Sequence, residues 1–366
     1  MTGSRGPAAA GERTAASGAA GAAQRLTGAG YASCHHGEIL QGVFRDGQGQ
    51  RVAGLVTLPL PGLGTRARFT RRPGTPPEDL SVTPADRAKA LRAAALAEAE
   101  CCRLGRTEPC GGRLRLDGDI PVGLGMGSSS SDVIAAVRAV AAAHGMSLTP
   151  QAIARLAVRA EQASDPLMLD GGPLLFAQRE GRVLEVFGSA LPPAVVVGCT
   201  LGGGRPVDTL ALPRHTCGEA DLDAYEELRT ALRRAVADRD ARLLGRVSTE
   251  SARLGQRRLP QEEFRTLEEI AARVGACGVQ IAHSGSVAGL LFDPAAEPAD
   301  GLRRRLRDCA TALAGHGMPV SRIFTTCDTP TRFTINEESF HGRAHSGVDR
   351  QAGPGASRRR THLPAL

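Results

Sequence analysis

The sequence predicts an α+β protein organised around one glycine-rich loop, and three observations support this class. Strand-like stretches follow one another through the first seventy residues. A strand, a glycine loop and a helix then occur in direct succession around residue 120. Beyond residue 194, helices and strands are interleaved and a strand near Ile323 comes last, which favours an α+β layer.

The first hundred residues are expected to supply three strands and a helix, with ordered structure beginning near Leu26. Residues 31–44 mix strand-forming residues with a polar cluster, and strands are also expected at 52–58 and 65–70, with Pro61-Gly62 separating these two. A loop follows at 73–77. The Ala/Leu/Glu-rich stretch at 85–104 predicts a helix.

The central loop, residues 119–127, contains glycine at three alternate positions, and serines occupy 128–131, where a helix to about residue 143 begins. Upstream, Leu114 and Leu116 alternate with arginines and indicate a strand. The first N–H groups of a helix lack internal partners, and the helix dipole adds positive charge there. The pattern therefore predicts a phosphate-binding turn. A buried helix is supported by apolar residues at helical spacing: Val133, Ile134, Val137 and Val140.

Two better-known phosphate loops do not fit this stretch. No Gly-Lys-Ser/Thr sequence ends the loop, and Lys89 lies well outside it, so it is not a P-loop. A dinucleotide fingerprint would need Ser128 as its third small residue and a second strand carrying an acid, which is missing. A tight turn with a serine N-cap and no ligand remains possible, but a cap needs one serine and this loop has four.

The helix after the loop's own helix is expected at 150–161, with Thr149 as its cap and Pro150 at its first position. Two antiparallel helices return the chain to its starting side, so Glu161 and Asp165 should come back toward the glycine loop. One carboxylate there could hold Mg²⁺, and the other could accept a proton from an attacking hydroxyl. If the two acids are considered without the glycine loop, a solvated helix end would also explain them.

The rest of the chain is expected to form a hairpin and then an interleaved second half that opens at 195–197. The expected elements are hairpin strands at 174–176 and 182–187, helices at 220–237, 241–254 and 261–274, strands around Val279 and Ala288, a helix at 299–314 and a strand near Ile323. Small residues at 282–286 lie between two apolar strands, which suits either a close backbone approach or a plain hairpin turn.

Polar residues in the first strand form a second candidate site. Glu38 and Gln41 suit hydrogen bonding to a polar substrate, although a lone acid on the wet face of a strand would look the same. His35 and His36 are adjacent, so they should point to opposite faces of the strand, and shared metal ligation is not expected.

Composition limits the other function classes. The net charge of +7 is carried almost wholly by arginine, with much of it at 303–305 and 358–360, and aromatic residues make up only 3%. Scattered arginine without stacking surfaces weakens the case for nucleic-acid binding. The nine cysteines include no C-x-x-C pair, so the spacing predicts neither a zinc site nor a disulfide framework.

The composition of the chain's ends and its hydropathy predict where in the cell the protein is located. Residues 1–25 are rich in Ala, Gly and Ser without an apolar core, which indicates a disordered leader and not a signal peptide. Residues 337–366 are expected to form a disordered basic tail. No apolar run reaches membrane-spanning length. We therefore expect a cytoplasmic protein without a membrane partner, either a monomer or a homodimer.

Several motifs together resemble the GHMP kinase superfamily, and most of all its L-threonine kinase of cobalamin side-chain synthesis. They cover about residues 32–328, nearly all of the chain expected to be ordered. The matching residues are Ser33-Cys34, Gly37-Glu38, Gln41-Gly42, Ile120-Pro121-Val122, Gly125-Met126, Ser128-Ser129, Asp132, Glu161, Asp165, Leu174, Phe176 and the run Ala282-His283-Ser284-Gly285-Ser286-Val287.

The resemblance implies a GHMP kinase fold: an N-terminal domain like the second domain of ribosomal protein S5, over 26–193, and a ferredoxin-like C-terminal domain, over 194–336. It implies ATP and Mg²⁺ in the cleft, with Asp165 as the candidate base and Ser129 and Glu161 as metal ligands. The ATP-binding residues would be Pro121, Gly123, Leu124, Gly125, Met126, Gly127, Ser128, Ser129 and Ser130. The substrate-facing residues would be Glu38, Gln41, His283 and Ser284.

The expected function is phosphorylation of a hydroxyl on a small amino acid, with L-threonine as the first candidate acceptor. His35-His36 and the stretch after Asp165 depart from the threonine kinase pattern where the acceptor should lie. Another hydroxylated amino acid or an amino alcohol therefore remains an alternative acceptor. A non-catalytic ligand sensor on the same fold is a second alternative, and a nucleic-acid binder using the arginine tail is a third.

Overall fold

The computed structural model describes residues 26–120, 124–169, 171–202, 218–282 and 286–326, and the α+β class predicted from the sequence is confirmed. The elements of these ranges are β1 (Thr27–Arg45), β2 (Arg51–Arg72), β3 (Leu80–Thr83), α1 (Ala88–Gly105), β4 (Gly111–Gly118), α2 (Ser128–Ala143), α3 (Pro150–Glu161), β5 (Leu174–Ala177), β6 (Arg182–Val186), β7 (Val195–Thr200), α4 (Glu219–Asp238), α5 (Ala241–Gly255), α6 (Phe264–Val274), β8 (Gly278–Ile281), β9 (Val287–Phe292), α7 (Ala299–Gly315) and β10 (Val320–Thr325).

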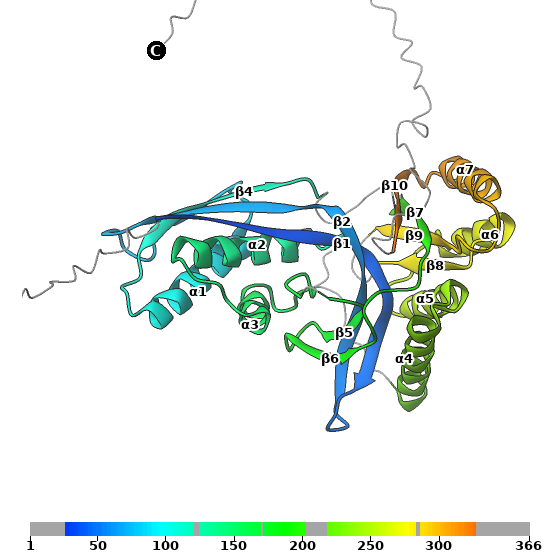
Figure 1. Cartoon of the computed structure of the whole chain (residues 1–366), viewed down its shortest axis with the longest axis horizontal. Coiled ribbons are helices and arrows are strands. Elements are labelled where there is room, and N and C mark those ends of the chain that lie inside the picture. The colour runs from blue at the N-terminus through cyan, green and yellow to red at the C-terminus, as the bar shows by residue number, and fades with distance from the viewer. Residues whose placement is uncertain (1–25, 121–123, 170, 203–217, 283–285, 327–366) are drawn as a thin grey trace, which may run out of the picture. The chain divides into compact units, whose positions relative to one another are not determined.

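The strands form one connected sheet in which β1 is the bridge between two groups of elements. Its order is β10-β7-β9-β8-β1-β2-β4-β3, with β5 and β6 attached to β2. One part of β1 packs on α2, whereas another part packs on α4 and α5 (Figure 1). The link from β1 to β8 is the single residue pair Glu38 and Ile281. The middle of β1 is therefore where the two groups of elements meet.

Strand β2 corrects one expectation. Residues 52–58 and 65–70 were predicted as separate strands, but they belong to one strand of 22 residues. Cys34 pairs with Leu60 while Ser33 pairs with Gly64, so the strand register with β1 skips residues 61–63. The Pro61-Gly62 dipeptide thus marks a bulge instead of a turn, because a proline without an N–H is tolerated where no ladder bond is needed. Strand β3, which pairs parallel to β4, was not predicted.

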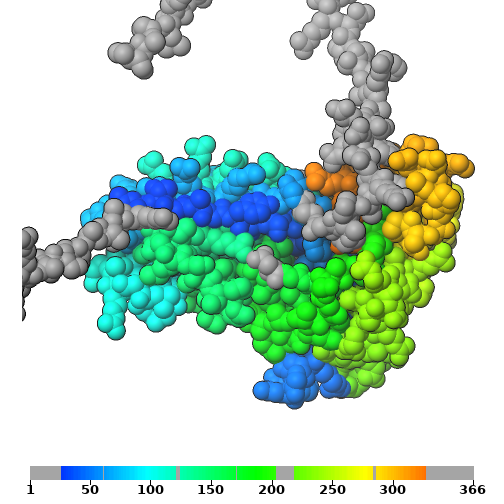
Figure 2. Space-filling view, viewed as in Figure 1, coloured from blue at the N-terminus to red at the C-terminus, as the bar shows by residue number. Residues whose placement is uncertain are grey.

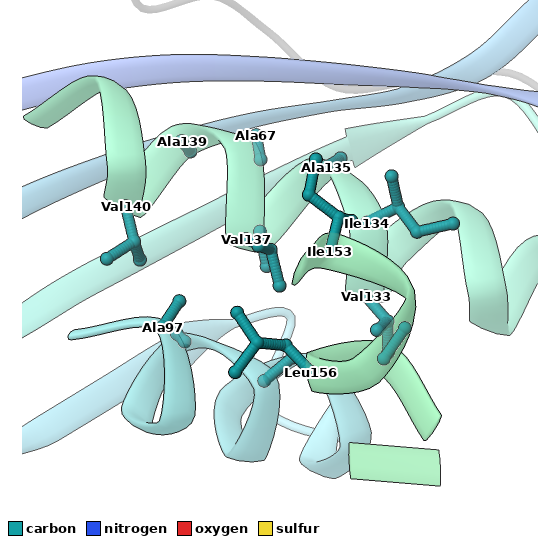
Figure 3. Packing of buried hydrophobic residues seen from close by; sticks show 14 of the residues in the cluster. Ala67, Ala97, Val133, Ile134, Ala135, Val137, Ala139, Val140, Ile153 and Leu156 are labelled. Carbon is teal, nitrogen blue, oxygen red and sulfur yellow. The ribbon is translucent and has the colours of Figure 1, made fainter. Parts of the chain in front are cut away.

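Helix α2 lies in the centre of the first group and is buried on nearly every side (Figure 3). The four residues predicted as its apolar stripe are all fully buried. A glycine in β1 lets the strand approach this helix closely: a Cβ on Gly30 would lie 2.2 Å from the Ala135 carbonyl oxygen. Any larger residue at this position would overlap the backbone of α2, so glycine sets the short distance between β1 and α2.

Other local predictions are confirmed. The Thr149 hydroxyl accepts a hydrogen bond from the Ala152 N–H, and Pro150 is the first residue of α3. Among the described residues, no helix is both long and apolar enough to cross a membrane. Residues 1–25 and 337–366 lie outside the described ranges. The division into domains at residue 193 stays a prediction.

Candidate active site

The site begins in the middle of β1, where a regular strand is interrupted. The register with β2 shifts between His35 and Glu38 and again between Glu38 and Leu40. Both His35 and Glu38 are almost completely buried, at 2% and 4% exposure. By contrast, the turn that follows β1 is exposed at the surface (Figure 2). The irregular backbone at this point brings the side chains of His35 and Glu38 together, although residues three apart in a regular strand point to opposite faces.

The glycine loop meets this part of β1 at the start of α2. Gly127 is the N-cap of α2 and has a left-handed backbone with φ of 70°. A Cβ on Gly127 would lie 2.5 Å from the His35 ring and 3.3 Å from the Asp165 carboxylate. Only glycine therefore fits, and the first N–H groups of α2 are left facing the site without helical partners.

The serines at the start of α2 have two different uses. Ser129 Oγ donates to Glu161 Oε2 over 2.7 Å, and Ser130 Oγ donates to Glu161 Oε1 over 2.9 Å. Ser131 instead donates to the Ala32 carbonyl and accepts from the Thr65 N–H, which ties α2 to β1 and β2. Helix α3 thus returns Glu161 to the glycine loop, as the antiparallel helices predicted.

Asp165 is held at the start of α2 by contacts of both its backbone and its side chain. Its N–H donates to Ser130 Oγ over 3.1 Å, and its Oδ2 lies 3.1 Å from His35 Nε2 in an ion pair. The ligand atoms of His35, Glu38 and Asp165 all lie within 4.8 Å of one another. The structure therefore gathers two acids and a histidine beside Glu161 and the start of α2.

Burial and neighbouring charge perturb two of these groups. Burial raises the pKa of Glu161 to about 7, and the charge of Asp165 adds to this rise while the Ser129 and Ser130 hydroxyls oppose it. Burial alone would lower the pKa of His35, but Asp165, the Glu38 charge and the Gly37 carbonyl together raise it to about 9. His35 is therefore a buried cation at neutral pH.

Glu161 has the properties of a metal ligand. It is 96% buried, at 4% exposure, and among the described residues its partners are hydroxyl groups and not an arginine or lysine. A buried carboxylate beside a second acid is costly unless a cation accompanies it. Oxygen ligands from Glu161 and Ser129 suit Mg²⁺, which also keeps several waters. The protonated His35 makes the His35, Glu38 and Asp165 group less suited to a cation.

The other predicted residues are only partly brought together. Met126 accepts a hydrogen bond from the His35 N–H through its carbonyl, and its side chain packs in a buried cluster with Leu124 at its edge. The Gln41 N–H donates to Ser251 on α5, and the Gln41 side chain lies near Gly255. These contacts place Gln41 on the α5 side of β1. Four of the predicted residues lie outside the described ranges: Pro121, Gly123, His283 and Ser284.

Sequence reasoning missed the role of the histidines. His35 pairs with Asp165, whereas His36 Nδ1 contacts Gln280 Oε1 at 3.1 Å on the other side, so their predicted opposite orientation is confirmed. Burial lowers the pKa of His36 to about 4, against the Gln280 contact. The one signal for the His35 pairing was its departure from the family pattern. Arg258, which was also not predicted, interacts electrostatically with Glu38.

A pocket of about 180 Å³ is lined by Ser128 at the start of α2, together with residues of β2, β4 and α2 and the segment before α1. Its charged lining residues are linked: Arg87 Nε lies 3.1 Å from Asp132 Oδ2, and Thr65 donates to the other Asp132 oxygen. Asp132, part of the resemblance, thus has a described structural role in holding this wall. Through Ser128, the pocket adjoins the start of α2.

The arrangement defines an α+β protein in which a glycine-capped helix start and buried acids meet at the junction of two groups of elements. Sequence comparison names the class: the GHMP kinases N terminal domain matches residues 88–171, and the GHMP kinases C terminal domain matches residues 228–309. The chain thus matches both domains of the GHMP kinases, in this order along the sequence.

Curated relatives and solved structures agree with this family. The chain is 29% identical over 184 residues to an L-threonine kinase of Citrobacter freundii, covering 50% of this chain and 62% of that protein. It resembles homoserine kinase from Cytophaga hutchinsonii with a TM-score of 0.60, 14% identity and coverage of 83% and 96%. The structure of MDDEF in complex with MVAPP, AMPPCP and magnesium has a TM-score of 0.56, 14% identity and coverage of 82% and 96%. The chain thus spans about three fifths of the curated relative.

Proposed function

We propose that this protein is an ATP-dependent kinase that phosphorylates the hydroxyl of a small amino acid, with L-threonine as the first acceptor to test. The observation that carries the proposal is the pair of hydrogen bonds from Ser129 and Ser130 to buried Glu161, next to the ion pair of Asp165 and His35. The names of the curated relative and of the fold neighbours support a kinase acting on a small hydroxyl compound.

The start of α2 would bind the phosphates of ATP. Its unpaired N–H groups and the helix dipole favour an anion, and Gly127 leaves room for the anion to approach the backbone. Glu161 and Ser129 would hold Mg²⁺, which when bound neutralises charge on the phosphates. A fold neighbour solved with AMPPCP and magnesium supports the choice of ATP and Mg²⁺.

Asp165 would act on the acceptor. Its carboxylate would take the proton of the acceptor hydroxyl as that oxygen forms its bond to the γ-phosphorus and the bond to the ADP oxygen breaks. Protonated His35 would hold the Asp165 carboxylate in place and put a positive charge beside the phosphates. Phosphoryl transfer depends mainly on positioning and charge neutralisation, so these contacts matter more than the strength of the base.

Glu38 would recognise the amino group of the acceptor. It is buried beside His35 and Asp165, and a carboxylate there can form a charge-assisted hydrogen bond with an ammonium group. An amino alcohol would keep this contact, whereas a simple alcohol would not. This is why an amino acid or amino alcohol is proposed and why the exact acceptor requires an assay.

The deciding experiment is a panel of acceptors assayed by ADP release. L-threonine, L-serine, L-homoserine and an amino alcohol are each added to the full chain with ATP and Mg²⁺. Acceptor-dependent ADP release with formation of the phosphorylated product is expected for at least one amino compound. ATP binding without turnover across the panel would point to a ligand sensor and contradict the proposed activity.

A further inference from the structure

A second cluster of polar side chains is buried far from the candidate active site, where α1, α2 and β4 come together. Glu98 and Cys102 lie one turn apart on α1, Cys110 precedes β4, and His144 is the C-cap of α2. All four side chains are at most 4% exposed. Cysteine sulfur, histidine nitrogen and carboxylate oxygen are all donor types that bind Zn²⁺ in proteins.

Ligand atoms of Glu98, Cys102 and His144 all lie within 4.8 Å of one another, and Cys110 joins this group through its contact with Glu98. Cys102 Sγ and Cys110 Sγ each lie 3.6 Å from Glu98 Oε1. Zn–S bonds of about 2.3 Å and Zn–O bonds of about 2.1 Å place a sulfur and an oxygen ligand about 3.6 Å apart. His144 Nε2 is 2.7 Å from Glu98 Oε2, so that hydrogen bond has to open by about 0.6 Å to reach the spacing of two ligands.

The charges also balance. Arg71 is buried against the cluster and donates through Nε and Nη2 to Glu98 Oε1, at 3.2 Å, with Nη2 4.0 Å from Cys102 Sγ. Two thiolates and one carboxylate carry three negative charges, and a divalent ion with one arginine carries three positive charges. A guanidinium next to a metal-bound thiolate or carboxylate is a typical outer-shell partner that orients the ligands.

We propose that Glu98, Cys102, Cys110 and His144 form a structural zinc site. On binding, the two thiols lose their protons to solvent and form Zn–S bonds, while His144 binds as the neutral ring. The site has no open position and lies away from Glu161, so it fastens the ends of α1 and α2 to β4. The sequence did not predict it because the ligands come from three elements without C-x-x-C spacing.

Zinc analysis of the tag-free full chain tests this site. Wild-type protein loaded with zinc under reducing conditions and then gel-filtered is expected to retain about one zinc per chain. Cys102→Ser and Cys110→Ser should each lower the zinc content to near zero, because serine replaces a soft sulfur ligand. Cys309→Ser, which changes an equally buried cysteine on α7, should retain the metal.

X-ray absorption of the zinc-loaded wild type gives a test that needs no variant. Two sulfur atoms at about 2.3 Å and two nitrogen or oxygen atoms at about 2.0–2.1 Å are expected. Asp165→Asn should keep its zinc, since the metal is not in the active site. Zinc content below about a tenth per chain in folded wild type, or a zinc shell without sulfur, would overturn the proposal and leave a hydrogen-bonded cluster only.

Discussion

His35 Nε2 lies 3.1 Å from Asp165 Oδ2, which joins the middle of β1 to the segment after α3. His35 also contacts the glycine loop through the Met126 carbonyl, and Asp165 contacts the first turn of α2 through the Ser130 hydroxyl. A buried ion pair of this kind fixes geometry more than it adds stability. The pair therefore sets the position of the proposed base relative to the start of α2.

Replacing the proposed base tests the chemistry directly. Asp165→Asn keeps the size of the side chain but removes its ability to accept a proton, so kcat should fall by about 10² to 10⁴. ATP binding, measured by calorimetry, should remain because the start of α2 is unchanged. A kcat close to that of wild type in a folded variant would remove Asp165 from the role of base.

Glu161→Gln tests metal binding. The concentration of Mg²⁺ needed for half-maximal activity should rise, because a neutral amide replaces the buried carboxylate. Since the pKa of Glu161 is raised to about 7 by burial, protons should compete with Mg²⁺ below pH 7 in the wild type but not in the variant. Glu108→Gln changes an exposed glutamate and serves as the control. An Mg²⁺ requirement equal to that of wild type would contradict ligation by Glu161.

The charge of His35 should be visible in the pH dependence of activity. Because Asp165 outweighs burial and raises the pKa of His35 to about 9, kcat/KM of the wild type should fall as the pH rises through 9. His35→Gln should lower activity at neutral pH and lose this alkaline decline. His316→Gln, an exposed histidine, should leave the profile as in wild type. An unchanged alkaline limb in His35→Gln would assign that limb to another group.

The same pKa shift predicts how stability depends on pH. The folded-state pKa of His35 lies above its ordinary value of 6.5, so its contribution to stability is complete below pH 6.5 and is lost as the pH rises through about 9. The difference in unfolding free energy between wild type and His35→Gln, measured with urea, should therefore shrink from neutral pH to pH 10. A constant difference over that range would contradict the ion pair.

Gly127→Ala tests the fit of the loop, and Gly145→Ala is its matched control. Both glycines have φ near 70°, but a Cβ on Gly145 meets nothing within 4 Å, whereas a Cβ on Gly127 lies 2.5 Å from His35. Gly145→Ala should cost about 1–2 kcal/mol from backbone strain and keep full activity. Gly127→Ala should add about 1–3 kcal/mol of overpacking and lose most activity. Equal behaviour of the two variants in urea unfolding and ADP release would show that the contact has no role.

Much of the fold could be predicted because its signals are local. The alternation at Leu114 and Leu116, the stripe along α2 and the cap at Thr149 depend on residues a few positions apart, and each gave the correct element. The boundaries of β2 could not be predicted in the same way. Whether Pro61-Gly62 ends a strand depends on its pairing with β1, which the local pattern does not contain.

In the candidate site, too, local features could be predicted from the sequence and long-range contacts could not. The sequence by itself determined the strand, glycine loop and helix, and the return of Glu161 and Asp165 by α3, because short connections restrict where the chain can go. Only the tertiary structure decided that His35 meets Asp165 and that two cysteines, a glutamate and a histidine converge elsewhere. Those contacts join distant segments through strand register and helix packing, and such long-range geometry leaves no periodic signal in the residues themselves.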